Sequence, residues 1–159
     1  MTDHLEQILT FVVDNQRFAI LLSTVERVIQ AVAVTRLTHS PSFIEGAIDY
    51  HGEVIAVLNM RKRLGFPFQE LKVTDQFIIA HSTIRKMALI VDQVENIVQP
   101  HSHDLYQSSK LDERLDLFTV LRDDDGIILI PDLERFLSQS EEIQLDKGLE
   151  ATLATTNHL

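Results

Sequence analysis

The stretch over residues 40–66 constrains most strongly what this chain can fold into. Within it, His51-Gly52 separates two short apolar runs at the place where a two-residue hairpin turn requires positive φ. Glycine adopts that conformation without steric cost, so the pattern predicts a β-hairpin. Asn59 follows as a good N-cap, and Gly65 stands where a short helix would end. The stretch therefore predicts a compact unit, a hairpin that leads directly into one helical turn.

Short runs rich in β-branched and aromatic residues recur along the rest of the chain, at 9–13, 17–22, 76–80, 87–91, 94–98, 117–122 and 127–130. Strands at this spacing favour a barrel or sandwich over a parallel α/β sheet. No glycine-rich phosphate loop follows any of them, which argues against a nucleotide site. A strand pair, a connector and an apolar strand occur once before residue 70 and once after it. This recurrence predicts two similar small barrels.

The C-terminal part is expected to be less ordered. Pro131-Asp132 followed by LERFL predicts a short helix with Leu133 on its apolar face. The polar segment 101–116 reads as a mobile loop. Beyond it, residues 138–159 are acidic and poor in apolar side chains, so we expect a partly disordered tail.

Composition excludes several classes of protein. The 159 residues fit one domain, and the absence of cysteine excludes disulfides and thiol chemistry. The net charge is −10, of which residues 100–159 contribute −8, which argues against nucleic acid or an anionic membrane surface as a partner. No apolar run reaches the roughly 20 residues of a membrane helix, and the polar N-terminus does not resemble a secretion signal. We therefore expect a cytoplasmic protein that does not insert into a membrane.

Motifs for catalysis and metal binding are missing. The sequence has no HExxH and no GxSxG, and the carboxylates of Glu141 and Glu142 lie in the acidic tail rather than in a cleft. We expect no enzyme activity, no metal and no cofactor. One alternative stays open: a small hydrolase or ligand-binding barrel with its pocket between the two subdomains.

Several short motifs, in this order and at this spacing, resemble those of the CheW-like domain family, the adaptors of bacterial chemotaxis. They are Phe11-Val12-Val13 through Arg17-Phe18-Ala19-Ile20, Val25 with Val28, Pro41 to Gly46, Gly52, Leu64-Gly65, Ala88 to Val94, and Ile128 to Leu133. Each motif is weak alone, and the combination is specific. The resemblance covers residues 8–137, nearly the whole chain.

The resemblance implies a mainly β fold of two five-stranded SH3-like barrels that share an apolar core, with short helices, one of them near the C-terminus. We expect a single domain over residues 8–137, with a first subdomain near 23–72 and a second formed by 8–22 plus 73–137. It also implies a function without catalysis: coupling methyl-accepting receptors to a CheA-type histidine kinase through protein contacts.

By the same resemblance, we predict a partner-binding surface that combines charged, turn and apolar residues: Val25, Arg27, Val28, Ile44, Gly46, His51, Gly52 and Val54. Two of these positions depart from the family pattern. Arg27 stands where the family commonly has Glu, and His51 stands where it has Arg. The family's two positions can hold opposite charges, whereas Arg27 and His51 cannot attract each other at any pH.

Overall fold

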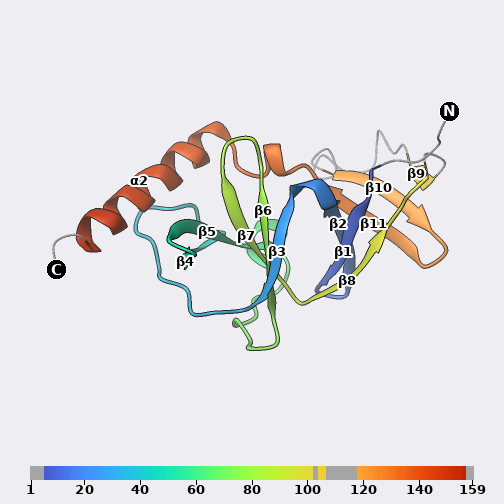
Figure 1. Cartoon of the computed structure of the whole chain (residues 1–159), viewed down its shortest axis with the longest axis horizontal. Helices are drawn as coiled ribbons and strands as arrows, with labels where there is room; N and C mark the ends of the chain where they lie inside the picture. The colour runs from blue at the N-terminus through green and yellow to red at the C-terminus, as the bar shows by residue number, and fades with distance from the viewer. Residues whose placement is uncertain (1–5, 102–103, 107–117, 157–159) are drawn as a thin grey trace.

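The computed structural model describes residues 6–101, 104–106 and 118–156. Within them the chain is mainly β, and its strands form two sheets that lie side by side, with one long helix along an edge (Figure 1). The mainly β fold of two units predicted from the sequence is confirmed. Most of the segment 101–116, which we predicted to be a mobile loop, lies outside the described residues.

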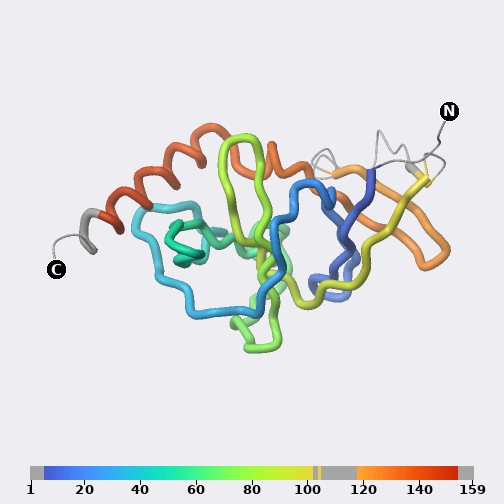
Figure 2. Tube along the Cα trace, viewed as in Figure 1, coloured from blue at the N-terminus to red at the C-terminus, as the bar shows by residue number. Residues whose placement is uncertain are grey.

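One sheet joins the two ends of the chain. Its order is β8-β1-β2-β11-β10-β9, where the strands are β1(Ile8–Val13), β2(Gln16–Leu21), β8(Gln93–Val98), β9(Leu105–Tyr106), β10(Phe118–Asp123) and β11(Gly126–Pro131). The N-terminal hairpin therefore lies beside the C-terminal hairpin, as the trace in Figure 2 shows. The connection is the parallel pairing of β2 with β11, in which Phe18 lies opposite Leu129.

The other sheet has the order β3-β6-β7-β5-β4, with β3(Val25–Gln30), β4(Ile44–Tyr50), β5(Glu53–Asn59), β6(Gln76–His81) and β7(Lys86–Val91). This pairing corrects the predicted division of the chain. We assigned 73–137 to the second subdomain, but β6 and β7 pair with β3 and β5 and so belong with the first. Apolar runs identify strands but do not identify their partners, so the sequence could not place this hairpin.

The local predictions for the central hairpin are confirmed. His51 and Gly52 have φ values of 53° and 85°, the conformation that a two-residue turn needs, and the Gly52 N–H donates to Asp49 Oδ1 over 2.8 Å. Asn59 caps α1(Met60–Leu64) by accepting a hydrogen bond from the Lys62 N–H. Gly65 ends this helix with a φ of 75°.

A shared apolar core holds the two sheets together, as predicted. It contains Phe11 and Phe18 from one sheet and Leu58 and Leu89 from the other, all without solvent exposure, and Phe136 closes it from the C-terminal side. Fully burying one such side chain contributes about 1.5–3 kcal/mol to the free energy of unfolding, so this cluster is the main source of stability for the packing of the two sheets. Each sheet also has a smaller cluster of its own, around Phe77 in one and Leu121 in the other.

The predicted acidic tail is largely helical, which corrects our expectation. The short 3-10 helices η1(Leu22–Thr24) and η4(Leu133–Arg135) lie near the seam, and α2(Gln139–Thr156) follows. Leu145 of α2 is fully buried in the shared core, and Arg85 binds Glu142 and Asp146 over 2.5 and 2.7 Å. These contacts come from distant parts of the chain, so the weak apolar pattern of the tail did not reveal them. Residues 157–159 lie outside the described part.

Candidate functional site

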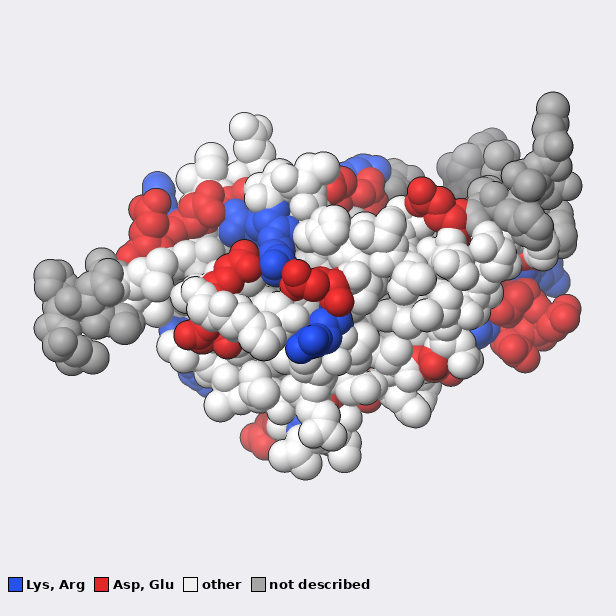
Figure 3. Space-filling view, in the orientation of Figure 1, with Lys and Arg blue, Asp and Glu red and all other residues white. Residues whose placement is uncertain are grey.

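The structure brings Arg27 and His51 of the predicted surface together. Arg27 and His51 are exposed, and both line a shallow cavity of about 310 Å³. The other residues that line it are Glu26, Tyr50, Glu53 and Lys86. In Figure 3, acidic and basic side chains lie against one another near the centre of the visible face, over β3 and the β6–β7 hairpin.

A β-bulge explains why two neighbouring residues of β3 reach the same cavity. Val25 lies opposite Ala80 and Arg27 lies opposite Ile79, so Glu26 is the extra residue on this strand. In a regular strand, successive side chains point to opposite faces. The bulge lets Glu26 and Arg27 line the cavity together, which the sequence pattern alone does not indicate.

Lys86 forms the electrostatic centre of this cavity. Its Nζ donates to Glu53 Oε2 over 3.0 Å and to Glu26 Oε1 over 3.2 Å. The hydrogen bond that Lys86 donates to Glu53, and next the one that it donates to Glu26, raise the pKa of Lys86 above its ordinary value. Lys86 is therefore positively charged at neutral pH, and the carboxylates of Glu26 and Glu53 balance its charge.

Arg27 and His51 are left without such balance. Neither forms an ion pair within the part of the chain that the structure describes, and the ring of His51 lies edge-on to Tyr50 with centroids 4.5 Å apart. The guanidinium of Arg27 is therefore exposed at the cavity without an acidic partner in the described residues. Sequence reasoning identified Arg27 and His51 but missed Glu26, Glu53 and Lys86, because only the sheet pairing brings these three together.

The apolar residues of the predicted surface fall into two groups. Val54 is 38% exposed, and Val25 and Val28 are half-buried against the shared core. Ile44, however, is only 6% exposed, and Gly46 is buried. Ile44 and Gly46 belong to the interior, so the prediction that they lie on an accessible surface is wrong.

The two predicted glycines have different structural roles. A Cβ on Gly46 would lie 2.0 Å from the carbonyl oxygen of Thr35, so this position allows the backbone of the 31–35 segment to approach closely. A Cβ on Gly52 would meet nothing within 4 Å, and its role is the positive φ of the turn. Gly52 therefore shapes the rim of the cavity, beside His51.

A larger groove of about 500 Å³ lies where the two units meet, as the alternative prediction of a ligand pocket requires. Apolar residues such as Ile8 and Leu121 line it, and Glu6, Asp132 and Glu134 are among its polar residues. Within the described residues, no group of three or more His, Cys, Asp or Glu side chains is placed to hold a metal ion.

The fold and this surface can be compared with known proteins. The family model described as CheW-like domain matches residues 7–141. The chain belongs to the CheW-like domain family. The matched range includes every strand of both sheets and ends within the first turn of α2, so most of that helix lies beyond the CheW-like match.

Individual CheW proteins are similar over most of their length. The chemotaxis protein CheW of Thermotoga maritima is 28% identical over 144 residues, which cover 90% of this chain and 93% of that protein. The chemotaxis protein CheW of Rhizobium meliloti is 26% identical over 105 residues, 66% of this chain and 68% of the relative. The crystal structure of a CheW scaffolding protein from Thermoanaerobacter tengcongensis has the same fold, with a TM-score of 0.76, 23% identity, and coverage of 86% of this chain and 94% of that one.

In the described ranges of this CheW-like chain, no helix combines the length and the apolar character needed to cross a membrane.

Proposed function

We propose that this CheW-like chain is a cytoplasmic adaptor of chemotaxis signalling that couples methyl-accepting receptors to a CheA-type histidine kinase through protein contacts alone. The observation that carries the proposal is the CheW-like match over residues 7–141. Relatives that cover nearly the whole chain are named chemotaxis protein CheW, and a neighbour in fold is named a scaffolding protein.

The physical basis of the proposed coupling is a fixed geometry. The two units share one buried core, and Arg61 of α1 binds Asp14 and Asp92 across the seam over 2.8 and 2.7 Å. Surfaces on the two units therefore keep a constant relative orientation. Partners that each bury an interface of standard size, about 1,200–2,000 Å², would be held in one arrangement without any chemical step.

The charged cavity is one proposed docking surface, and its charges indicate which chemical group of a partner would bind there. Lys86 is balanced by Glu26 and Glu53, whereas Arg27 has no acidic partner in the described residues. A carboxylate on the partner, placed opposite Arg27, would supply the missing charge. The exposed side chain of Val54 adds apolar contact beside it.

The seam between the units is the second proposed docking surface. Val25, Val28 and Val94 are half-buried there against the shared core, so a partner could cover their remaining exposed area. Beside the charged cavity, the face over β1 and β8 is mostly uncharged (Figure 3). An apolar partner surface fits this region better than a charged one.

Reconstitution tests the proposal. Receptor-containing vesicles, a CheA-type kinase and this chain are mixed, and kinase activity and co-sedimentation are measured with each component omitted in turn. We expect receptor-dependent kinase activity only when the chain is present. If omission of the chain changes neither quantity, the adaptor function is wrong.

The double change Arg27→Glu with His51→Arg tests the charged surface. This change restores the Glu and Arg that are common in the family at these two positions. The binding partner is a kinase–receptor complex from an organism whose own CheW-like adaptor has that Glu and Arg. We expect more of the chain to be recovered with this complex after the change. Ile127→Ser is the matched control, since Ile127 is 55% exposed and lies on β11, away from the cavity. No gain, or an equal gain in the control, would contradict the role of these two positions.

The groove between the units keeps a ligand-binding protein as the competing function. A thermal-shift screen against common metabolites and metal ions separates the two. A large stabilisation by one compound, together with failed reconstitution, would favour the competing function, because a ligand that binds only the folded state raises its melting temperature.

A further inference from the structure

His51 gives the charged cavity a property that the family's common arginine at this position does not supply. An arginine stays positively charged throughout the range in which proteins function, whereas histidine is the side chain that changes its charge between about pH 5 and pH 8. His51 is exposed and lines the cavity, so its ring exchanges protons with the solvent. The charge of the cavity therefore depends on pH through this side chain.

The turn between β4 and β5 places His51 at the rim of the cavity. Its backbone has a φ of 53°, and the N–H of the following Gly52 donates to Asp49 Oδ1 over 2.8 Å, which closes the turn. The ring of His51 lies against that of Tyr50, with the centroids 4.5 Å apart. The backbone of the turn and this ring contact together hold the imidazole beside the cavity.

The charged residues that line the cavity come from β3, β5 and β7, and their formal charges cancel. Glu26 and Glu53 are acidic, and Arg27 and Lys86 are basic. Both carboxylates accept a hydrogen bond from Lys86, and neither forms an ion pair with Arg27 or His51 in the described part of the chain. Protonation of His51 therefore changes the formal charge of the lining from zero to +1 and gives Arg27 a second cation beside it.

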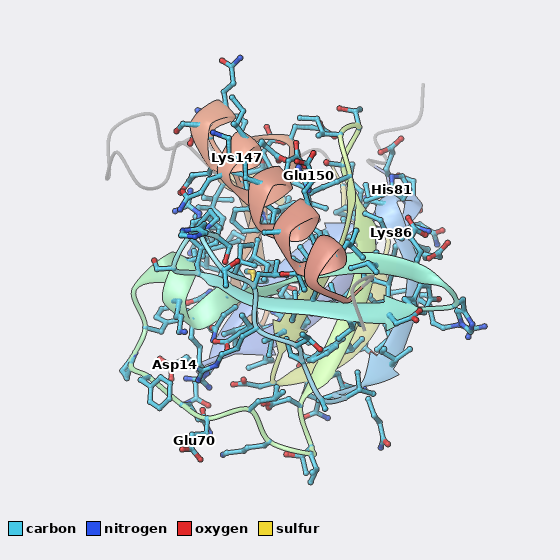
Figure 4. All side chains as sticks on the ribbon, turned by 90° about the vertical axis from the view of Figure 1, so that its left-hand side faces the viewer. Asp14, Glu70, His81, Lys86, Lys147 and Glu150 are labelled. Carbon is cyan, nitrogen blue, oxygen red and sulfur yellow. The ribbon has the colours of Figure 1, made fainter. Side chains whose placement is uncertain are left out.

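Two further titratable side chains lie near the cavity without lining it. Asp49 belongs to the same turn, and His81 lies opposite Lys86 across β6 and β7. His81 and Lys86 are close to each other at the right of Figure 4, whereas Asp14 lies on the other side of the view. Because aspartate, glutamate and tyrosine ordinarily titrate outside the range from about pH 5 to pH 8, the pH dependence of this surface comes from its histidines.

We propose that the charged cavity is a pH-dependent docking site for an acidic segment of a partner protein, and that protonation of His51 strengthens docking. This regulation rests on the adaptor function proposed above. One carboxylate of the segment lies opposite Arg27, and a second accepts a hydrogen bond from the protonated ring of His51. Because the whole chain has a net charge of −10, its remaining surface repels an acidic segment on average, so binding depends on these two cations.

A tetraglutamate peptide tests the site without a kinase or a receptor. The peptide is titrated into the purified full chain at about pH 8 and at about pH 6, and two-dimensional amide NMR gives its dissociation constant and the amides that respond. We expect responses at Arg27 and Gly52 and about threefold tighter binding at the lower pH, the effect of one exposed ion pair. Equal affinity at the two pH values, or responses confined to other parts of the chain, overturns the proposal.

Two substitutions of His51 fix its charge in opposite ways. His51→Asn is neutral at both pH values and suits a residue with positive φ, and His51→Arg is charged at both and restores the residue common in the family. Both variants change an exposed turn residue, so we expect both to fold. Each should lose the pH dependence, and His51→Arg should bind the peptide more tightly than His51→Asn throughout. If His51→Asn keeps the full pH dependence, the proposal is wrong.

Two other histidines supply the controls. His39 is exposed, also has a positive φ of 58°, and does not line the cavity, so His39→Asn should keep the threefold difference. His81→Gln tests the histidine nearest to Lys86 and should keep the difference as well. If His81→Gln abolishes the pH dependence and His51→Asn does not, the proposal is overturned.

Reconstitution with the kinase and the receptor separates this regulation from the adaptor function. The recovery of the kinase at about pH 6 is divided by that at about pH 8, for the unchanged chain and for His51→Asn. Comparing the two ratios cancels the titration of the kinase and the receptor, and we expect the unchanged chain to have the larger ratio by about threefold. If the chain couples and the ratios are equal, the pH regulation is wrong and the adaptor function stands. If nothing couples at either pH, the adaptor function is wrong and its regulation with it.

Discussion

Arg61 is predicted to be the main polar contact that fixes the two units against each other. It lies on α1, which follows β5 of the sheet β3-β6-β7-β5-β4, and its side chain is 14% exposed. Its Nη1 donates to Asp14 Oδ1 over 2.8 Å and its Nη2 to Asp92 Oδ2 over 2.7 Å. Asp92 Oδ2 also accepts the Asp14 N–H, and the Asp92 N–H donates to the carbonyl of Val12. Replacing Arg61 therefore affects a connected set of hydrogen bonds.

Arg61→Met keeps the apolar stem of the side chain and removes only the guanidinium. A hydrogen bond to a charged group contributes about 1.5–3 kcal/mol. The carboxylates of Asp14 and Asp92 are 36% and 32% exposed, so water recovers part of that loss. We therefore expect a decrease of about 2–3 kcal/mol in the free energy of unfolding, rather than the sum of two full contributions.

Urea denaturation, followed by circular dichroism, measures this change. With a slope of about 2 kcal/mol per molar urea, the midpoint should fall by about 1 M. The matched control is Lys62→Met, because Lys62 is 40% exposed and its pair with Glu45 is solvated. Exposed pairs contribute about 0–1 kcal/mol. If Arg61→Met costs no more than Lys62→Met, the clamp across the seam has no special role and our reasoning is refuted.

Three further changes test separate features. Gly52→Val should cost about 1–2 kcal/mol in denaturant melts, because φ is 85° there while the surrounding space is open; an unchanged melt would show that the turn tolerates a side chain. Gly148→Ala would place a Cβ 2.6 Å from the carbonyl of Thr38, so hydrogen exchange in α2 should speed up, although alanine by itself favours a helix by about 1 kcal/mol. Against the penalty of burial, hydrogen bonds from Asn59 and Lys62 hold the pKa of Glu45 below its ordinary value of 4.5. Its stabilisation is therefore present above that pH and lost as pH falls through the lowered pKa, and Glu45→Gln should flatten this acid limb in melts taken from pH 6 to about pH 2.

Local rules were enough for the elements that depend on neighbouring residues. The turn at His51-Gly52 and the cap at Asn59 each use groups within three positions of themselves, and both have the predicted geometry. The contacts of Arg61 are different, because Asp14 and Asp92 are 47 and 31 positions away. No local pattern could have selected these partners.

The error in the C-terminal region has the same origin. The segment that forms α2 has few apolar residues, and its order depends on contacts that Leu145, Gly148 and Glu142 make with the body of the protein. Arg85, which binds Glu142, lies 57 positions earlier. Helices in proteins depend mainly on such tertiary packing rather than on propensity. A weak local pattern was therefore a poor guide to disorder.

The candidate surface shows a subtler limit of strand patterns. In the sheet β3-β6-β7-β5-β4, both edge strands contain a bulge. In each bulge the extra residue is a glutamate, Glu26 on β3 and Glu45 on β4. Each carboxylate then binds a lysine, Lys86 or Lys62. Strict alternation would have placed Glu26 and Arg27 on opposite faces, and the charged cavity would have lost one of them. Because a bulge shifts every later side chain of its strand, the charges of this surface follow from the register and not from the order of residues alone.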